Sequence, residues 1–166
     1  MKCKIKIYYR YEGYTEEELL KSGLDHLRSA KILFDKNPLC YDSAGYLCHL
    51  GIELVLKACV LNHQDSFSGI HKLMDLYEIL KAAGIKMKPK QENDLKRLDQ
   101  FYHLRYTSPK KPVSIGDEDW HSVWSVFKAI KNYLPSSLKS FINDYAKKSI
   151  PLKKGGRILM VKPKNV

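Results

Sequence analysis

The amino-acid sequence predicts an all-α fold, an up-and-down bundle of about five helices with a small β appendage formed by the two termini. Apolar residues recur at steps of three and four through most of residues 15–146, which is the spacing of one face of an α-helix. Proline or glycine interrupts this pattern at helix-length intervals. We therefore expect a strand segment at 1–14, a helical bundle domain at 15–146 and a basic tail at 147–166.

Composition and charge narrow the class of partner. Hydrophobic residues make up 44% of the chain and charged residues 28%, values typical of a globular domain. Twenty-nine Lys and Arg oppose 18 Asp and Glu, which gives a formal net charge of +11. Such an excess favours nucleic acid, nucleotides, an anionic surface or an acidic protein. A basic surface that serves only solubility is the alternative.

The cysteines and the apolar runs bear on location. None of the four cysteines belongs to a CxxC pair or to a zinc-finger spacing, so we expect reduced thiols, no metal and no cofactor. No uninterrupted apolar run reaches membrane-spanning length, and the N-terminus alternates Lys with apolar residues, unlike a secretory signal. We expect a cytoplasmic protein without membrane association.

The first part of the chain predicts a strand followed by a long helix. Residues 2–9 alternate lysine with apolar residues, the pattern of a half-buried strand. Thr15 and Glu18 have the spacing of a capping box, so a first helix is expected near 15–35, ended by the Asn-Pro pair that follows.

A second helix is expected from a cap at Asp42 or Ser43. Its residues are apolar nearly all round, which is typical of a helix in the middle of a bundle. Gly45 and Gly51 lower its helix propensity, so we expect them to allow close approach of neighbouring helices.

The rest of the chain predicts shorter elements. A polar loop is expected at 63–69, and a Gly-Gly pair in the tail predicts a hairpin that pairs with the N-terminal strand. The expected helices are 70–83, 91–106, one that starts from a cap at Ser114 or Asp117 and runs to Leu134, and a short one at 138–146.

Three groups of residues are candidates for binding. Glu53 and Lys57 are four residues apart on the apolar second helix. They form either a structural ion pair or a site in which Lys57 lies beside a phosphate. His71 starts the third helix, where a histidine is more often structural than catalytic. Aromatic residues alternate with His and Arg105 at the end of the fourth helix, a pattern that suits base stacking and phosphate binding. The pattern alone favours the alternative, in which the aromatic residues belong to the core and Arg105 pairs with an acid.

The segment from Tyr41 to Ala58 resembles the second helix of HEPN domains (higher eukaryotes and prokaryotes nucleotide-binding), which carries a Tyr, small residues and then Glu and Lys four apart. His71-Lys72-Leu73 is similar to the family's His-x-Leu, and Arg105-Tyr106 to its later Arg-Tyr. The similarity covers roughly residues 15–134. It implies a helical bundle that is usually dimeric, with Glu53, Lys57, His71, Arg105 and Tyr106 as candidate ligand-binding residues.

The resemblance leaves two activities open. Some members are ribonucleases with an Arg-x4-6-His motif across a dimer cleft, and others are binding or partner modules, often beside a small nucleotidyltransferase in a toxin–antitoxin pair. Arg97 and His103 fit the nuclease spacing. Residues six apart on a straight helix point about 120° apart, so a shared catalytic site needs a kink or a second subunit.

The preferred hypothesis is a non-catalytic homodimeric module that binds nucleotide, RNA or a partner protein. The alternatives are a metal-independent ribonuclease, with His103 as acid or base and Arg97 stabilising phosphate charge, and a purely structural interaction module. No Gly-rich phosphate loop or HExxH motif favours another enzyme class.

Overall fold

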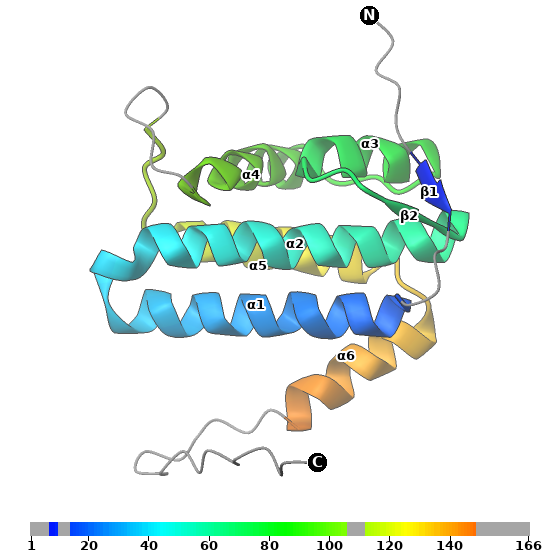
Figure 1. Cartoon of the computed structure of the whole chain (residues 1–166), viewed down its shortest axis with the longest axis horizontal. Helices are drawn as coiled ribbons and strands as arrows, with labels where there is room; N and C mark the ends of the chain where they lie inside the picture. The colour runs from blue at the N-terminus through cyan, green and yellow to red at the C-terminus, as the bar shows by residue number, and fades with distance from the viewer. Residues whose placement is uncertain (1–6, 10–13, 106–111, 149–166) are drawn as a thin grey trace, which may run out of the picture.

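Six α-helices make up most of the described chain in the computed structural model, and the predicted all-α bundle is confirmed (Figure 1). The structure describes residues 7–9, 14–105 and 112–148. The helices are α1 (Glu16–Lys36), α2 (Tyr41–Gln64), α3 (Leu73–Ala82), α4 (Pro89–Gln100), α5 (Asp119–Lys131) and α6 (Ser136–Lys148). Two 3-10 helices, η1 (Pro38–Cys40) and η2 (Phe101–Arg105), and two strands, β1 (Ile7–Tyr9) and β2 (Ser66–Ser68), complete the described elements.

The first helix begins at the predicted capping box. The Thr15 hydroxyl accepts from the backbone N–H of Glu18 at 3.2 Å, and the Glu18 carboxylate accepts from the backbone N–H of Thr15 at 2.8 Å. Two N–H groups that lack a partner within the helix are thereby satisfied. That backbone hydrogen bond also lowers the pKa of Glu18.

The central helix α2 lies between α1 and the layer formed by α3 and α4, with α5 behind it (Figure 1). The prediction that Asp42 or Ser43 caps it was wrong, because α2 already begins at Tyr41 and no side chain caps it. The turn before α2 allows the helix to begin at Tyr41. Asn37 accepts from the N–H of Leu39 at 2.9 Å, and η1 leads directly into α2.

Glycines let α1 and α2 approach closely. A Cβ added to Gly23 would lie 2.9 Å from the carbonyl oxygen of Gly51, and one added to Gly51 would lie 2.7 Å from the Leu27 side chain. The two backbones therefore touch where no side chain fits between them. The expected role of Gly51 in close packing is confirmed, with α1 as the partner helix.

The fourth predicted helix is two elements. It was expected near 91–106, but α4 ends at Gln100 and the chain tightens into η2. In a 3-10 helix, side chains three residues apart lie on the same side. Phe101 and Leu104 therefore both face Gly45 of α2, where an added Cβ would come within 3.6 Å and 2.6 Å of them respectively.

Two further helix starts differ from the sequence prediction. Helix α3 begins at Leu73 rather than at residue 70, and α5 begins at Asp119 with Glu118 at its N-cap. Neither Ser114 nor Asp117 caps α5. The Asp117 carboxylate instead accepts from the hydroxyl of Tyr41, and this hydrogen bond raises the pKa of that tyrosine.

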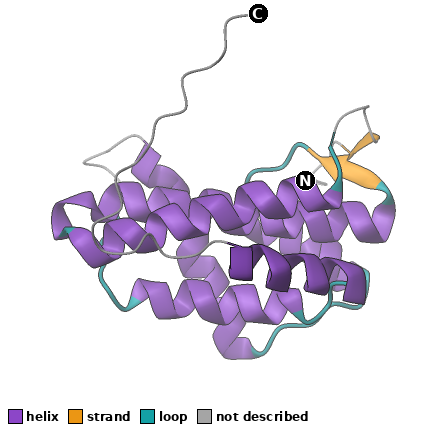
Figure 2. Ribbon diagram, turned by 90° about the horizontal axis from the view of Figure 1, so that it is seen from below, coloured by secondary structure: helices purple, strands orange, loops and turns teal. Residues whose placement is uncertain are grey.

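The β appendage includes a strand that the sequence did not predict. Strand β1 pairs antiparallel with β2, with Tyr8 opposite Phe67, so part of the predicted polar loop at 63–69 is a strand and part extends α2. Asp65 ends α2 in the left-handed conformation (φ 48°), which turns the chain into the extended direction. The pair lies at one end of the bundle (Figure 2). The predicted tail hairpin lies outside the described residues.

Most of the apolar side chains of α2 are buried inside the molecule. By hydropathy, the stretch Pro38–Gln64 is long and apolar enough to span a membrane, which corrects the sequence estimate, but 78% of its most apolar window is buried. The helix thus has the environment of a buried core helix. Burial also raises the pKa of the thiols of Cys48 and Cys59, the latter to about 12, so both remain protonated core groups.

Candidate functional site

Glu53 and Lys57 form an ion pair in the middle of α2. The Lys57 ammonium lies 2.8 Å from Glu53 Oε1, and each side chain is only 5% exposed. Removing two charges from water is costly, so such a pair is stable only when further hydrogen bonds satisfy it. The structural ion pair expected from the sequence is thus present, and it is buried in the bundle.

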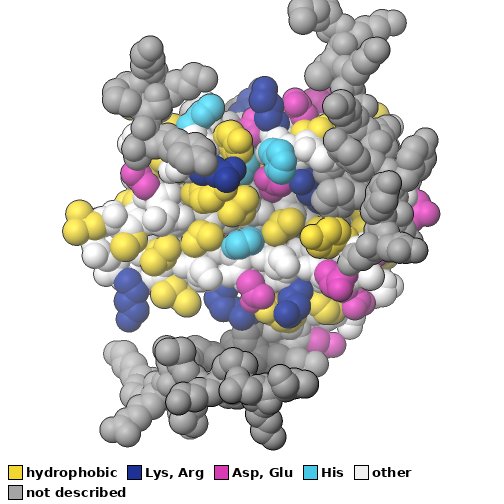
Figure 3. Space-filling model, viewed as in Figure 1, with side chains coloured by type: hydrophobic (Ala, Val, Ile, Leu, Met, Phe, Trp, Pro, Cys, Tyr) yellow, Lys and Arg dark blue, Asp and Glu magenta, His cyan; other side chains and the backbone are white. Residues whose placement is uncertain are grey.

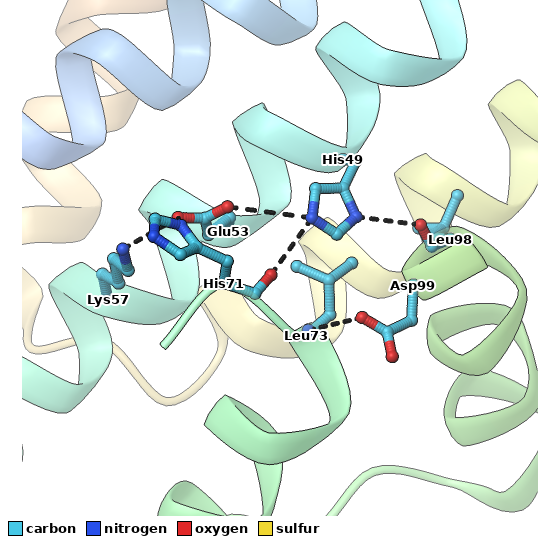
Figure 4. Close-up of polar contacts among 7 residues, drawn as sticks. All are labelled: His49, Glu53, Lys57, His71, Leu73, Leu98 and Asp99. Carbon is cyan, nitrogen blue, oxygen red and sulfur yellow. Dashed lines mark hydrogen bonds and ion pairs between the residues drawn. The ribbon is translucent and has the colours of Figure 1, made fainter. Parts of the chain in front are cut away.

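Two histidines supply those additional contacts (Figure 4). His71 Nδ1 lies 3.0 Å from Glu53 Oε1, and His49 Nε2 lies 3.7 Å from Glu53 Oε2. His71 is 65% exposed while His49 is fully buried. The Glu53 carboxylate is therefore linked to the surface through the His71 ring.

His49 is the residue of this cluster that the sequence analysis missed. Its two ring nitrogens each lie 3.1 Å from a carbonyl oxygen, Nδ1 from that of Leu98 and Nε2 from that of His71. The ring thus ties α2 to α4 and to the segment before α3. The available signal was its spacing, because His49 precedes Glu53 by four residues and so shares its helix face.

Asp99 connects α4 to the start of α3. Its carboxylate accepts from the backbone N–H of Leu73 at 2.6 Å and so caps α3 from another helix (Figure 4). A carboxylate at a helix N-terminus also interacts favourably with the helix dipole. This contact, together with His49, fixes the spacing between the two walls of a groove.

The groove lies between the start of α3 and the junction of α4 with η2, and has a volume of about 540 Å³. Histidine, basic and acidic side chains gather over this edge of the molecule (Figure 3). The residues that line the groove are Ile70, His71, Lys72, Asp75, Asp99, Gln100, Tyr102 and His103. Tyr102 is 41% exposed, and its ring centre lies 5.6 Å from that of His49 and 6.0 Å from that of His103.

The candidate residues of the nuclease motif have different environments. His103 lines the groove, but the Arg97 guanidinium binds Asp119, with its terminal nitrogen 2.9 Å from Asp119 Oδ2 and 2.9 Å from the carbonyl oxygen of Ser114. Asp119 is only 1% exposed. Its hydrogen bond raises the pKa of Arg97. The described contacts of Arg97 join α4 to α5 and do not include His103 or another groove residue.

The remaining candidates are only partly placed. Arg105 is exposed at the end of η2, two residues beyond His103, and Tyr106 lies outside the described residues. Among the residues that the structure describes, no group of three or more His, Cys, Asp or Glu side chains is arranged to hold a metal ion.

These features define a class of protein, a helical bundle whose central helix carries a Glu–Lys pair beside a surface groove. The HEPN domain family model matches residues 16–137, which is most of the chain. The chain belongs to the HEPN family, whose members are nucleotide- or RNA-related modules. Neither the curated proteins nor the solved structures gave a significant match.

Proposed function

We propose that this chain is a non-catalytic HEPN module that binds RNA or a nucleotide in the groove between α3 and η2. The observation that carries the proposal is the set of side chains at the groove. An exposed aromatic ring, Tyr102, lies beside the cation Lys72 and the imidazoles of His71 and His103. Aromatic faces stack on bases, while Lys and His hold phosphate.

The carboxylates of the groove favour a nucleotide over a bare anion. Asp99 is engaged by the N–H of Leu73, whereas Asp75 lies in the first turn of α3 and lines the groove. An ionised carboxylate accepts hydrogen bonds, and a base amino group or a ribose hydroxyl offers them. The groove therefore combines a stacking surface, an acceptor and cationic groups.

The surroundings of Arg97 support binding rather than cleavage. A ribonuclease of the expected type needs a cation that stabilises the developing phosphate charge next to the acid–base histidine. Arg97 is instead the partner of a buried carboxylate. Releasing it would leave Asp119 buried without a counter-charge, which is strongly unfavourable.

Binding is tested with fluorescence anisotropy of a labelled short single-stranded RNA. Tyr102→Ala should weaken binding by about 1–3 kcal/mol, the stacking contribution of one base. Tyr14→Ala is the matched control, because Tyr14 is a 61% exposed tyrosine ahead of α1 that is not among the residues lining the groove. Affinity should also fall steeply with salt. Equal affinity of wild type and Tyr102→Ala would refute this groove as the site.

We also propose that the functional unit is a homodimer. The apolar surface of α2 is largely covered within one chain and gives no argument for a dimer. Support now comes from the family and from two exposed apolar side chains near the turn between α1 and α2, Ile32 (53% exposed) and Leu39 (92% exposed). A row of hydrophobic side chains also follows α2 across one face (Figure 3). Light scattering should give twice the 19.2 kDa chain mass, and Leu39→Asp should shift it toward the monomer.

The partner-protein role, with a nucleotidyltransferase in a toxin–antitoxin pair, is the second candidate, and the same exposed Ile32 and Leu39 favour it. A protein that binds no RNA at low salt, but forms a stoichiometric complex with a co-expressed neighbouring nucleotidyltransferase, would support it. We place either role in the cytoplasm, since the described cysteines are all free thiols.

A further inference from the structure

A second groove lies on the part of the bundle formed by α1, α5 and α6, and shares no lining residue with the first. Figure 1 shows α6 crossing obliquely beside α1. The groove has a volume of about 450 Å³, within the range of roughly 300–1,000 Å³ that small-molecule sites occupy. Both tryptophans of the chain, Trp120 and Trp124, line it together with Tyr145.

Each of these three rings has a cation over it. The guanidinium carbon of Arg28 lies 5.1 Å from the centre of Tyr145. The ammonium groups of Lys31 and Lys128 lie 5.8 Å and 5.4 Å from the rings of Trp120 and Trp124. These distances are those of cation–π contacts, which hold long basic side chains against aromatic surfaces. The groove therefore presents fixed aromatic rings and positive charge together.

Trp124 is arranged as a stacking surface. It lies nearly parallel to Phe127, with the ring centres 5.3 Å apart and the planes inclined by 15°, yet 45% of it is exposed. Packing on Phe127 holds the indole in place. A ligand that stacks on the exposed indole would therefore meet a ring whose orientation is already fixed.

The charges of the groove are not all neutralised. Arg28 and Lys31 have the carboxylates of Asp25 and Asp35 as partners on α1. In contrast, Lys128 and Lys131 near the end of α5 have no carboxylate partner among the described residues, and Lys131 donates to the side-chain oxygen of Asn143 at 2.7 Å. An anionic ligand would find the Lys131 ammonium in the groove and the Lys128 ammonium over the Trp124 indole.

We propose that this aromatic–cationic groove, lined by Trp120, Trp124, Tyr145 and Lys131 and flanked by Lys128 over the Trp124 ring, is a binding site for single-stranded RNA. A base stacks on Trp124, and Lys128 and Lys131 hold the adjoining phosphates. An apolar peptide would use the rings but not the lysines, and an acidic peptide would use the lysines but not the rings. RNA uses both, and it suits a chain of net charge +11. The inference is independent of the α3–η2 groove.

The two tryptophans make the test direct, because all tryptophan emission of the chain comes from this groove. Titration with a short oligoadenylate at low salt should quench that emission in a saturable manner, and added salt should reverse it. Tyr102→Ala should leave the quenching unchanged, which separates this site from the first groove. Polyglutamate of similar length is the control for charge alone and should not quench.

Two variants identify the contacts. Trp124→Ala should weaken oligoadenylate binding about 5- to 150-fold, which is the stacking contribution of about 1–3 kcal/mol per base converted at about 1.4 kcal/mol per tenfold. The Lys128→Gln/Lys131→Gln pair keeps both indoles and should reduce the salt dependence. Ser29→Ala on α1 is the neutral control. Absence of quenching in the folded wild type, equal quenching by polyglutamate, or unchanged affinity in both variants would each overturn the proposal.

Discussion

The ion pair between Arg97 and Asp119 gives the sharpest test of whether Arg97 is a structural or a catalytic residue. Asp119 is 1% exposed and accepts from Arg97 and, at 2.9 Å, from the backbone N–H of Gly116. The Arg97 side chain is 41% exposed. Removing Arg97 therefore leaves a buried carboxylate, whereas removing Asp119 leaves a partly exposed guanidinium.

Arg97→Ala should be the more damaging change. It leaves a buried carboxylate without its counter-charge, a loss of about 3–5 kcal/mol for fully buried pairs. Solvent reaches the partly exposed arginine and screens the pair, so we expect the free energy of unfolding to fall by about 2–3 kcal/mol. Asp119→Ala should cost less, about 1–2 kcal/mol, because the freed guanidinium can turn to water.

Urea unfolding of both single variants and of the double variant measures these values. Because the two groups are in contact, the losses should not add, and a coupling energy of about 0.5–3 kcal/mol is expected. Lys96→Ala, at an exposed basic residue of α4, is the control and should stay within about 0.5 kcal/mol of wild type. If Arg97→Ala were as stable as wild type and instead abolished an RNA cleavage activity, the structural role would be refuted.

Three further predictions concern packing, pH and catalysis. Gly23→Ala should destabilise the fold by about 1–2 kcal/mol in urea, because the added Cβ meets the Gly51 carbonyl oxygen at 2.9 Å, whereas the exposed Ser22→Ala beside it should be near neutral. The pKa of Glu18 is depressed below its ordinary value of 4.5. The contribution of Glu18 to folding stability is therefore fully present above pH 4.5 and is lost as pH falls through the lower folded-state pKa. The melting-temperature difference between wild type and Glu18→Ala should therefore shrink on acidification, and a constant difference would contradict the capping role. Finally, wild type should not cleave single-stranded RNA in EDTA; cleavage that drops by about 10²–10⁴ in His103→Ala would establish the ribonuclease alternative.

Local patterns explain most of what the sequence predicted correctly. The capping box of Thr15 and Glu18 and the pair of Glu53 and Lys57 involve residues three or four apart, so helix geometry alone places their side chains together. The central position of α2 follows from its apolar character on nearly all sides. The helix boundaries were less accurate, because α4 changes to a 3-10 turn only where Phe101 and Leu104 meet Gly45 of another helix.

What the sequence by itself determined is thus the helical class, the family and the central ion pair, all of which depend on periodicity and short spacing. The tertiary structure alone decided which distant residues meet. Asp99 caps a helix that begins 26 residues earlier, His71 reaches Glu53 across 18 positions, and β1 pairs with residues near 67. The hydrogen bond to Asp119, another contact between distant residues, also occupies the guanidinium of Arg97. Side-chain periodicity fixes neighbours within one helix, whereas contacts between helices depend on how their surfaces pack, and no single stretch of sequence contains that information.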